Sequence, residues 1–129
     1  MKQPILILII SLLCSCSTSV VRNDATIRFT DKKHDFGKIP LKKEATYSFE
    51  FLNTGKSPVV IYDVKTSCGC TTPKWTKALV AVGKTGNIIV RYDASYPGEF
   101  HKSILVKYNG PDSPEMLEIG GEVEEELRN

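Results

Sequence analysis

The chain has 129 residues, and its 17 lysines and arginines nearly balance its 15 aspartates and glutamates, giving a formal net charge of +2 at pH 7. A charge this close to neutral gives no electrostatic reason to expect nucleic acid or another polyanion as a partner. Only four cysteines and two histidines are present, so few side chains suit redox chemistry or soft-metal binding.

The first twenty residues have the layout of a secretory signal. Lys2 supplies one cation, an apolar run from Ile5 to Leu13 follows with only Ser11 interrupting it, and small and polar residues come next. This run is about half as long as the roughly 20 residues that a helix needs to cross a bilayer. The segment therefore predicts export and not, by itself, a membrane span.

The signal ends in Leu13-Cys14-Ser15-Cys16, which resembles the box at which bacterial lipoproteins are cleaved and acylated. Cys16 fits the acylated position, because an aliphatic residue and two small residues precede it. Cys14 fits less well, since Ser11 would replace the aliphatic residue and Leu13 would occupy a small position. The alternative is a plain signal peptide with incidental cysteines. Acyl chains on Cys16 would hold the protein at a membrane without spanning it.

Cleavage before Cys16 would divide the chain into a signal of residues 1–15, an acylated tether of residues 16–25, one domain of residues 26–124 and an acidic tail of residues 125–129. The domain has the size of a single packed core. The tether that follows Cys16 reaches at most roughly 30 Å, so the domain is expected close to its membrane. No acidic pair follows Cys16, which favours the periplasmic side of a bacterial cell envelope.

Short runs of alternating apolar and polar residues fill the rest of the chain. In residues 44–53, Tyr47, Phe49 and Phe51 alternate with polar residues, a period of two that is typical of a half-buried strand. The turn residues at 53–55 then end the run. Strands are predicted at residues 25–30, 34–39, 44–53, 58–66, 86–93, 99–109 and 115–124.

These runs predict an all-β fold, an antiparallel sandwich of about seven strands, because turns separate them and no convincing helical stretch occurs. Ile88, Val90 and Tyr92 are expected to share one inward face. Residues 67–85 are expected to form a loop, and Gly120-Gly121 predicts a bulge or a close backbone approach. The free edges of such a sandwich would allow a partner to add a strand.

Cys68 and Cys70 are the two thiols of the predicted domain, and Gly69 separates them. In an extended chain their Cα atoms would lie about 7 Å apart, at or beyond the limit for a disulfide, so a direct bond requires a turn at Gly69. Three alternatives remain open: a structural disulfide or loop clasp, a strained and readily reduced redox pair, or two ligands of a metal ion. The oxidising environment of exported proteins favours pairing.

A metal site would need further ligands, because tetrahedral zinc takes four. The other soft candidates are His34, at the start of a predicted strand, and His101, on a polar strand face, and nothing in the sequence brings either to the cysteines. Copper would favour methionines, but Met1 lies in the signal and Met116 in a predicted core strand. The sequence therefore assigns no metal, and no cofactor is predicted.

Trp75 lies in the expected 67–85 loop and has two interpretations. It is either an exposed anchor for a partner, because tryptophan is enriched at binding hot spots, or a plug at one end of the sandwich. No catalytic set is recognisable. The triplet at residues 35–37 lacks the other parts of a kinase site, and neither histidine is paired with a carboxylate in a visible motif. A protein that is not an enzyme is expected.

Several segments taken together resemble a known family. They are HDFGKI (34–39), Asn-Thr-Gly (53–55), Ser-Cys-Gly-Cys-Thr (67–71) and Gly-Glu-Val (121–123), in this order. Over roughly residues 27–123 the chain is similar to an uncharacterised bacterial family of exported immunoglobulin-like domains, related in fold to Hydin-like and PapD-like sandwiches. Val82 stands where the family usually has a proline before the glycine. The resemblance implies an immunoglobulin-like sandwich in the cell envelope, and it implies no activity.

The resulting hypothesis is a lipid-anchored, non-catalytic envelope module that binds or scaffolds another protein. Its predicted contacts are the membrane, through lipid on Cys16, and an envelope protein, through the loop from Cys68 to Trp75 or through an edge strand. The alternative is a thiol-redox or metal-binding accessory protein that uses Cys68 and Cys70.

Overall fold

The computed structural model describes Ser15 and residues 23–125. The predicted signal apart from Ser15, Cys16 and most of the predicted tether therefore lie outside the described residues. The strands of the described part are β1 (Ile27–Phe29), β2 (Lys33–Pro40), β3 (Ala45–Asn53), β4 (Ile61–Thr66), β5 (Thr71–Trp75), β6 (Thr85–Tyr92), β7 (Gly98–Tyr108) and β8 (Glu115–Glu124). Among the described residues no helix is long and apolar enough to cross a membrane.

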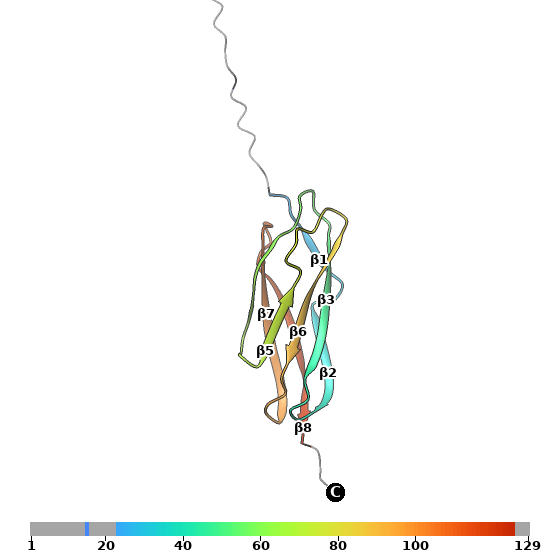
Figure 1. Cartoon of the computed structure of the whole chain (residues 1–129), viewed down its shortest axis with the longest axis vertical. Helices are drawn as coiled ribbons and strands as arrows, with labels where there is room; N and C mark the ends of the chain where they lie inside the picture. Colours follow the sequence, from blue (N-terminus) through green and yellow to red (C-terminus); the bar gives the residue numbers. More distant parts are fainter. Residues whose placement is uncertain (1–14, 16–22, 126–129) are drawn as a thin grey trace, which may run out of the picture.

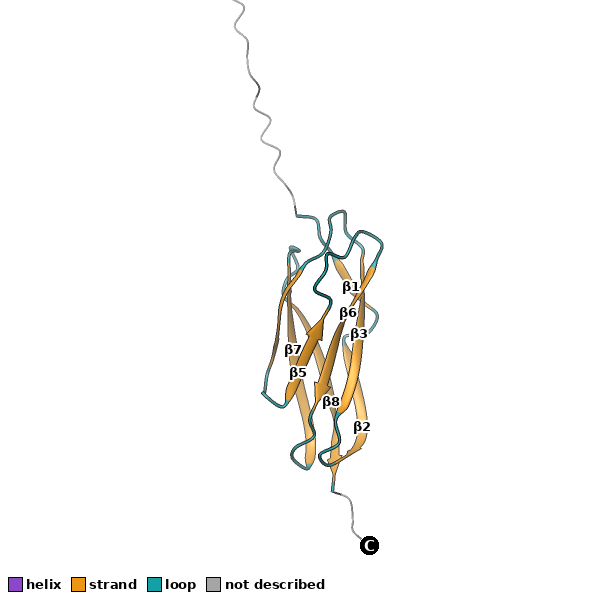
Figure 2. Cartoon of the chain, in the orientation of Figure 1, coloured by secondary structure: helices purple, strands orange, loops and turns teal. Residues whose placement is uncertain are grey.

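The strands form two four-stranded sheets, in the orders β1-β3-β6-β5 and β2-β8-β7-β4, which pack face to face as an elongated sandwich (Figures 1 and 2). The first order corresponds to strands A, B, E and D of a constant-type immunoglobulin domain, and β8-β7-β4 corresponds to G, F and C. The predicted all-β, immunoglobulin-like sandwich is thus confirmed, with β2 as an additional edge strand beside β8.

Two features differ from the expected arrangement. β5 lies inside the expected loop of residues 67–85 and pairs with β6, and β2 pairs with β8 in parallel. β5 escaped prediction because it is short and carries Pro73 at its centre, and proline normally argues against a strand. The parallel pair arises because β1 and β2 are separated by only a bend, so the chain changes sheets between them without the hairpin that would reverse its direction.

The core lies between the two inner faces, to which alternate residues of each strand contribute. The predicted inward residues of β6, Ile88, Val90 and Tyr92, are buried, as are Phe49 and Phe51 of β3. The largest fully buried side chains are Phe49, Phe51, Ile88, Ile104, Leu117, Ile119, Val59, Val90, Val106 and Asn53. The period-two pattern therefore located the core correctly.

The glycine pair of β8 marks a close backbone approach, as expected. A Cβ atom on Gly121 would lie 2.8 Å from the carbonyl oxygen of Gly37 and 2.9 Å from the ring of Phe100. The pairing of β2 with β8 is irregular between Asp35 and Lys38 of β2. Gly37 lies in this interval and has a φ of +67°. Glycine is needed at Gly37 because a side chain would strain that backbone.

Asn53 is the one amide side chain among the largest fully buried residues, and it ties two loops together. Its Nδ2 donates to the carbonyls of Ser57 and Val80, both at 2.9 Å, and its Oδ1 accepts from the N–H of Gly55 at 3.0 Å. These groups belong to the β3–β4 loop (54–60) and the β5–β6 loop (76–84), which we call the apical loops. They cover the end of the sandwich at which Asn23 begins the described domain (Figure 1).

Replacing Asn53 with alanine should lower the free energy of unfolding by about 2–4 kcal/mol, because two carbonyls and one N–H lose their partner in a site closed to water. Urea denaturation of both proteins measures this change. Asn87→Ala, at an exposed amide, is the matched control and should cost less than about 1 kcal/mol. Equal losses in the two variants would contradict the role given to Asn53.

Tyr108 makes stability sensitive to alkaline pH. Its hydroxyl is buried and finds no hydrogen-bond partner among the described residues. Burial, with smaller contributions from the carboxylates of Glu115 and Asp112, raises the pKa of Tyr108 from 10.0 to about 12. The folded state therefore holds this proton more tightly than the unfolded state does.

The free energy of unfolding should consequently fall as the pH rises from 10 to about 12, by up to about 2 kcal/mol, since water at the end of the domain screens part of the effect. Tyr108→Phe should remove this part of the pH dependence, which urea denaturation between pH 9 and pH 12 measures. A smaller slope should persist, because burial also raises the pKa of Tyr47 and Tyr92. An unchanged slope in Tyr108→Phe would contradict the assignment.

Candidate functional site

The turn between β4 and β5 carries the cysteine pair. Cys68 and Cys70 are joined by a disulfide, with their Cα atoms 5.4 Å apart. This is shorter than the roughly 7 Å of an extended chain, because the backbone turns through Gly69. The N–H of Cys70 points back to the sulfur of Cys68 at 3.2 Å, and the N–H of Thr71 donates to the carbonyl of Cys68 at 3.3 Å.

This turn is where the chain crosses from one sheet to the other. On one side the N–H of Ser67 donates to the carbonyl of Ser103 in β7, at 3.0 Å. On the other side the carbonyl of Cys70 accepts from the N–H of Asp93, at the end of β6, at 3.0 Å. The disulfide therefore closes a corner that links the edges of both sheets.

The surroundings of the pair fit a clasp that is partly open to solvent. Both cysteines are half-buried, whereas Gly69 between them is exposed. The hydroxyl of Thr66 lies 3.0 Å from the carbonyl of Cys68 and 3.1 Å from that of Thr71, so it braces the turn from β4. Cys70 also packs against the core, so Gly69 is the exposed part of the turn.

Trp75 lies at the end of β5 and is half-buried, with its ring packed against the core. Its Nε1 is enclosed and finds no hydrogen-bond partner among the described residues. The ammonium group of Lys77 lies 3.1 Å from the centre of the ring, in the position of a cation–π contact. The ring is thus partly covered by the core and partly by Lys77, and it offers little free area to a partner.

The two histidines lie in different surroundings. His34 stacks on Tyr47 with ring centres 3.6 Å apart, and His101 lies on the outer face of β7. Met116 is exposed on β8. The described residues contain no group of three or more histidine, cysteine, aspartate or glutamate side chains that could hold a metal ion. The metal alternative for Cys68 and Cys70 therefore gains no ligand set within that part of the chain.

The free edge of β5 is largely closed. In an antiparallel pair, residues whose main-chain groups face the partner strand alternate with residues whose groups face away. The bond from Thr76 N–H to the carbonyl of Asn87, at 3.1 Å, fixes this alternation and leaves Thr71, Pro73 and Trp75 facing away from β6. The groups of Thr71 are used by the cysteine turn, and Pro73 has no N–H.

β1 and β2 are poor edges for different reasons. β1 has three residues, too few for a long ladder. β2 is interrupted at Gly37, whose N–H is taken by the carboxylate of Asp35 at 2.7 Å, and it ends in Pro40. Bulges, prolines and short length are the usual means by which natural sheets prevent pairing at an edge.

β4 also has an irregularity, a register shift between Ile61 and Asp63, but its last residues, Val64 to Thr66, pair regularly and include no proline. The bond from Ser67 to Ser103 implies that Lys65 also faces β7, so the main-chain groups of Val64 and Thr66 face the free edge. No hydrogen bond within the described part of the chain occupies those outward N–H groups. Tyr62, in the same strand, is 64% exposed. Sequence reasoning proposed an edge but could not identify this one, because the choice depends on pairing direction.

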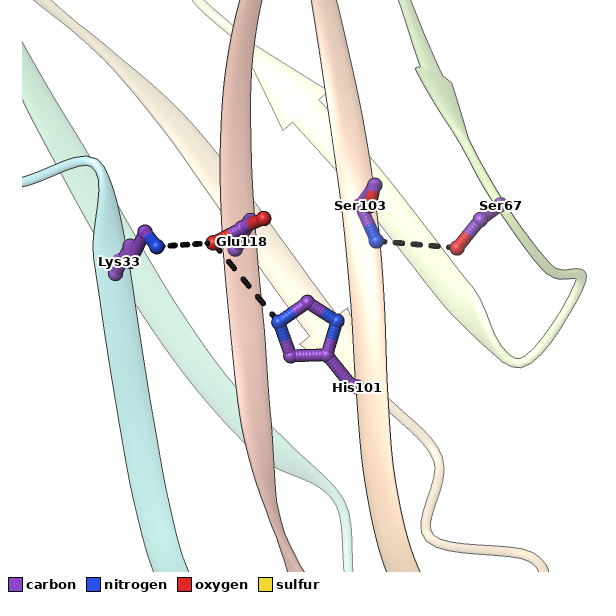
Figure 3. A network of polar contacts seen from close by, with 5 residues as sticks. All are labelled: Lys33, Ser67, His101, Ser103 and Glu118. Carbon is purple, nitrogen blue, oxygen red and sulfur yellow. Dashed lines mark hydrogen bonds and ion pairs between the residues drawn. The ribbon is translucent and has the colours of Figure 1, made fainter.

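A shallow open groove of about 890 Å³ lies on the outer face of β2, β8 and β7. Gly120 leaves its floor without a side chain, and Glu118 stands beside it in contact with Lys33 at 3.0 Å and His101 at 3.9 Å (Figure 3). The hydrogen bond from Lys33 lowers the pKa of Glu118. Lys33 and Glu118 therefore neutralise each other on the outer face of these strands. The Gly120-Gly121 pair is the feature of the sequence that marks this groove.

Solved structures similar to this chain share its fold. The PapD-like domain 7 of human CEP192 matches with a TM-score of 0.68 at 8% identity, over 81% of this chain and 89% of that one. A protein of unknown function from Porphyromonas gingivalis W83 matches with a TM-score of 0.70 at 14% identity, over 81% of this chain and 50% of that one. The VesB protease of Vibrio cholerae matches with a TM-score of 0.59 at 15% identity, over 79% of this chain but only 32% of the protease.

At these identities the likeness concerns the fold alone. Comparison with curated proteins gives no match. The family described as "Protein of unknown function (DUF1573)" matches residues 27–123. This span contains the cysteine turn, the edge of β4 and the groove, and it coincides with the region of the resemblance seen in the sequence.

Replacing Cys68 and Cys70 together with serine should lower the free energy of unfolding by about 1–2 kcal/mol, because the bond closes a very short loop and restricts the unfolded chain only slightly. Urea denaturation of the oxidised protein and the variant measures the difference. Reduced wild-type protein is the control and should match the variant. A loss above about 4 kcal/mol would show that the cysteines contribute more than loop closure.

Proposed function

This chain belongs to the DUF1573 family, and we propose that it is a non-catalytic binding module of the bacterial cell envelope, anchored by lipid on Cys16, that binds an extended segment of another protein along the free edge of β4. The family match and the PapD-like fold neighbours support a module of this kind. Neither assigns a partner.

The free edge of β4 is the observation that carries the proposal. Its outward main-chain groups are available at Val64 and Thr66, whereas the edges of β1, β2 and β5 are short, interrupted or blocked by proline. Variable-type immunoglobulin domains place an additional strand of their own at the corresponding edge, beside strand C. The geometry of the fold therefore accepts a strand there, and a partner segment would supply it in trans.

Exposed side chains give this edge a means of selecting its partner. Tyr62 offers a large amphipathic side chain, the kind enriched at binding hot spots. Asp63 and Lys65 place one charge of each sign on the same strand. Main-chain hydrogen bonds would supply affinity that does not depend on sequence, and these three side chains would supply specificity.

Site-specific photocrosslinking in living cells tests the proposal. Tyr62 and, in a separate protein, Tyr96 are replaced by p-benzoylphenylalanine in the full chain. Tyr96 is the matched control, because it is 77% exposed in the β6–β7 turn, away from the edge of β4. Irradiation should give adducts from position 62 that map to one short segment of a partner, and none from position 96. Equal adducts from both positions, or none from position 62, would contradict it.

Hydrogen exchange then separates strand addition from a side-chain contact. A synthetic peptide of the crosslinked segment should slow exchange of the Val64 amide, because that N–H becomes hydrogen-bonded. Trp75 is the internal control, since its amide faces the free edge of β5. Binding that leaves the Val64 amide unprotected would exclude pairing along β4.

Reversible thiol chemistry at Cys68 and Cys70 is the second candidate function, favoured by the position of the disulfide in a turn with exposed Gly69. Intact mass after equilibration with glutathione buffers tests it. Reduction within the range of periplasmic thiol–disulfide partners would support this function, and a bond that stays oxidised throughout would leave the pair as a clasp. The variant with both cysteines replaced by serine should still crosslink through position 62 if the cysteines are only structural.

A further inference from the structure

The β5–β6 loop contains a run of five apolar residues, four of which lie outside the core. Residues 78–82 read Ala-Leu-Val-Ala-Val, and only Val80 is buried, through its pairing with Val59. Leu79 is 66% exposed and Val82 is 49% exposed. Two exposed apolar residues on each side of buried Val80 thus gather in one short loop. An apolar surface of this kind indicates a contact.

This run lies at the end of the sandwich where the described domain begins. The N–H of Lys56 donates to the carbonyl of Asp24 at 3.0 Å, and the N–H of Thr54 donates to that of Thr26 at 2.9 Å. Asn53 joins the same β3–β4 loop to Val80 of the apolar run. Figure 1 shows both apical loops beside the start of the domain and the end of β8 at the opposite end.

The chain length between Cys16 and Asn23 limits how far this end lies from an anchor. Residues 17–22 separate the two, so their Cα atoms are at most about 25 Å apart. A lipid on Cys16 would thus keep the apical loops within reach of the headgroup layer. Holding a weakly binding surface so close raises its effective concentration, so even a small apolar contact becomes populated.

We propose, building on the lipid anchor of the proposed function, that the apical run of residues 78–82 lies in the headgroup region of the anchoring bilayer, with Leu79 and Val82 inserted. The sandwich then stands with its long axis away from the membrane. β4 runs along that axis from the apical end, so its free edge faces sideways and is open to a partner in the envelope (Figure 1).

The charges around the run favour a contact that is mainly apolar. Lys77 and Lys84 flank it, and both are exposed. The ammonium group of Lys84 can reach lipid phosphates while the apolar residues insert, whereas that of Lys77 lies over the Trp75 ring. Lys56 of the β3–β4 loop is a third exposed cation at this end, and the exposed Asp24 and Asp112 offset two of the three positive charges. Binding is therefore expected to depend only weakly on the fraction of anionic lipid.

Tryptophan fluorescence on vesicles tests the proposal with the acylated full-length mature chain. Trp75 is the only tryptophan, so Trp75→Phe gives a dark background for a single new probe. Leu79→Trp reports the apical run, and Tyr96→Trp is the matched control in the β6–β7 turn at the other end. The vesicles contain phosphatidylethanolamine and phosphatidylglycerol with brominated acyl chains, which quench tryptophan only at short range.

The probe at position 79 should be quenched by the brominated lipid and shielded from aqueous iodide, and the probe at position 96 should show neither effect. Equal behaviour at both positions would overturn the proposal. Shielding of position 79 in buffer without vesicles would also overturn it, because a second copy of the chain or another protein would then cover the run.

A second measurement uses the unacylated mature chain, in which Cys16→Ser removes the anchor. Leu79→Ser combined with Val82→Ser should lower its partition coefficient onto the same vesicles at least tenfold, whereas Met116→Ser, at an exposed apolar residue of β8, should change it less than twofold. Equal losses would overturn the proposal.

The two proposals fail separately. Intact mass of the native protein shows whether Cys16 is acylated, independently of the apical loops. If no acyl chain is found, the same fluorescence comparison is made with hexahistidine in place of Cys16 on vesicles carrying a nickel-chelating lipid. Absence of quenching at position 79 there would overturn the apical contact itself, and photocrosslinking at position 62 remains a separate test of the β4 edge.

Discussion

The burial of one amide side chain, that of Asn53, fixes the end of the sandwich on which the proposed contacts depend. An amide enclosed by the core has to find partners for its donors and its acceptor, and each partner here is a main-chain group of a loop. Its own main chain pairs with Lys84 and Gly83 as well. The bond to Val80 holds the middle of the apolar run at the core, while Leu79 and Val82 on either side stay exposed. The bond to Ser57 fixes the loop that leads into β4.

Local sequence patterns were sufficient to predict the strands in which apolar and polar residues simply alternate. Alternation in residues 44–53 located the inward face of β3, and the same rule located that of β6. The residues of the apical loops show the limit of such patterns. The sequence Asn-Thr-Gly indicates a turn, but nothing nearby reveals that the Asn53 side chain enters the core, because its partner Val80 lies far along the chain.

The candidate sites were only partly visible for the same reason. Cys68 and Cys70 stand out as a pair, yet their place at a corner between two sheets depends on Ser103 and Asp93, which come from distant strands. The main-chain groups that β4 leaves free depend on how it pairs with β7. β4 stands out as an edge because Pro73 removes an N–H donor from the free edge of β5. Neighbouring residues do not encode this, since it exists only once both sheets have assembled. The proposed lipid on Cys16 rests on the signal sequence alone, and Cys16 lies outside the described residues.

The direction in which β1 leaves the sandwich determines how the domain responds to a pulling force. β1 begins at the apical end and runs along the long axis, antiparallel to β3, with Ile27 opposite Asn53 and Phe29 opposite Phe51 (Figure 1). Tension applied to an anchored N-terminus along this axis loads that short ladder in shear, so its bonds resist together instead of opening one at a time. A segment paired beside β4 would lie along the same axis and would also be loaded in shear. With the proposed anchor and partner in place, such a domain would transmit force between them, and the rate at which it unfolds under load would set how long it does so.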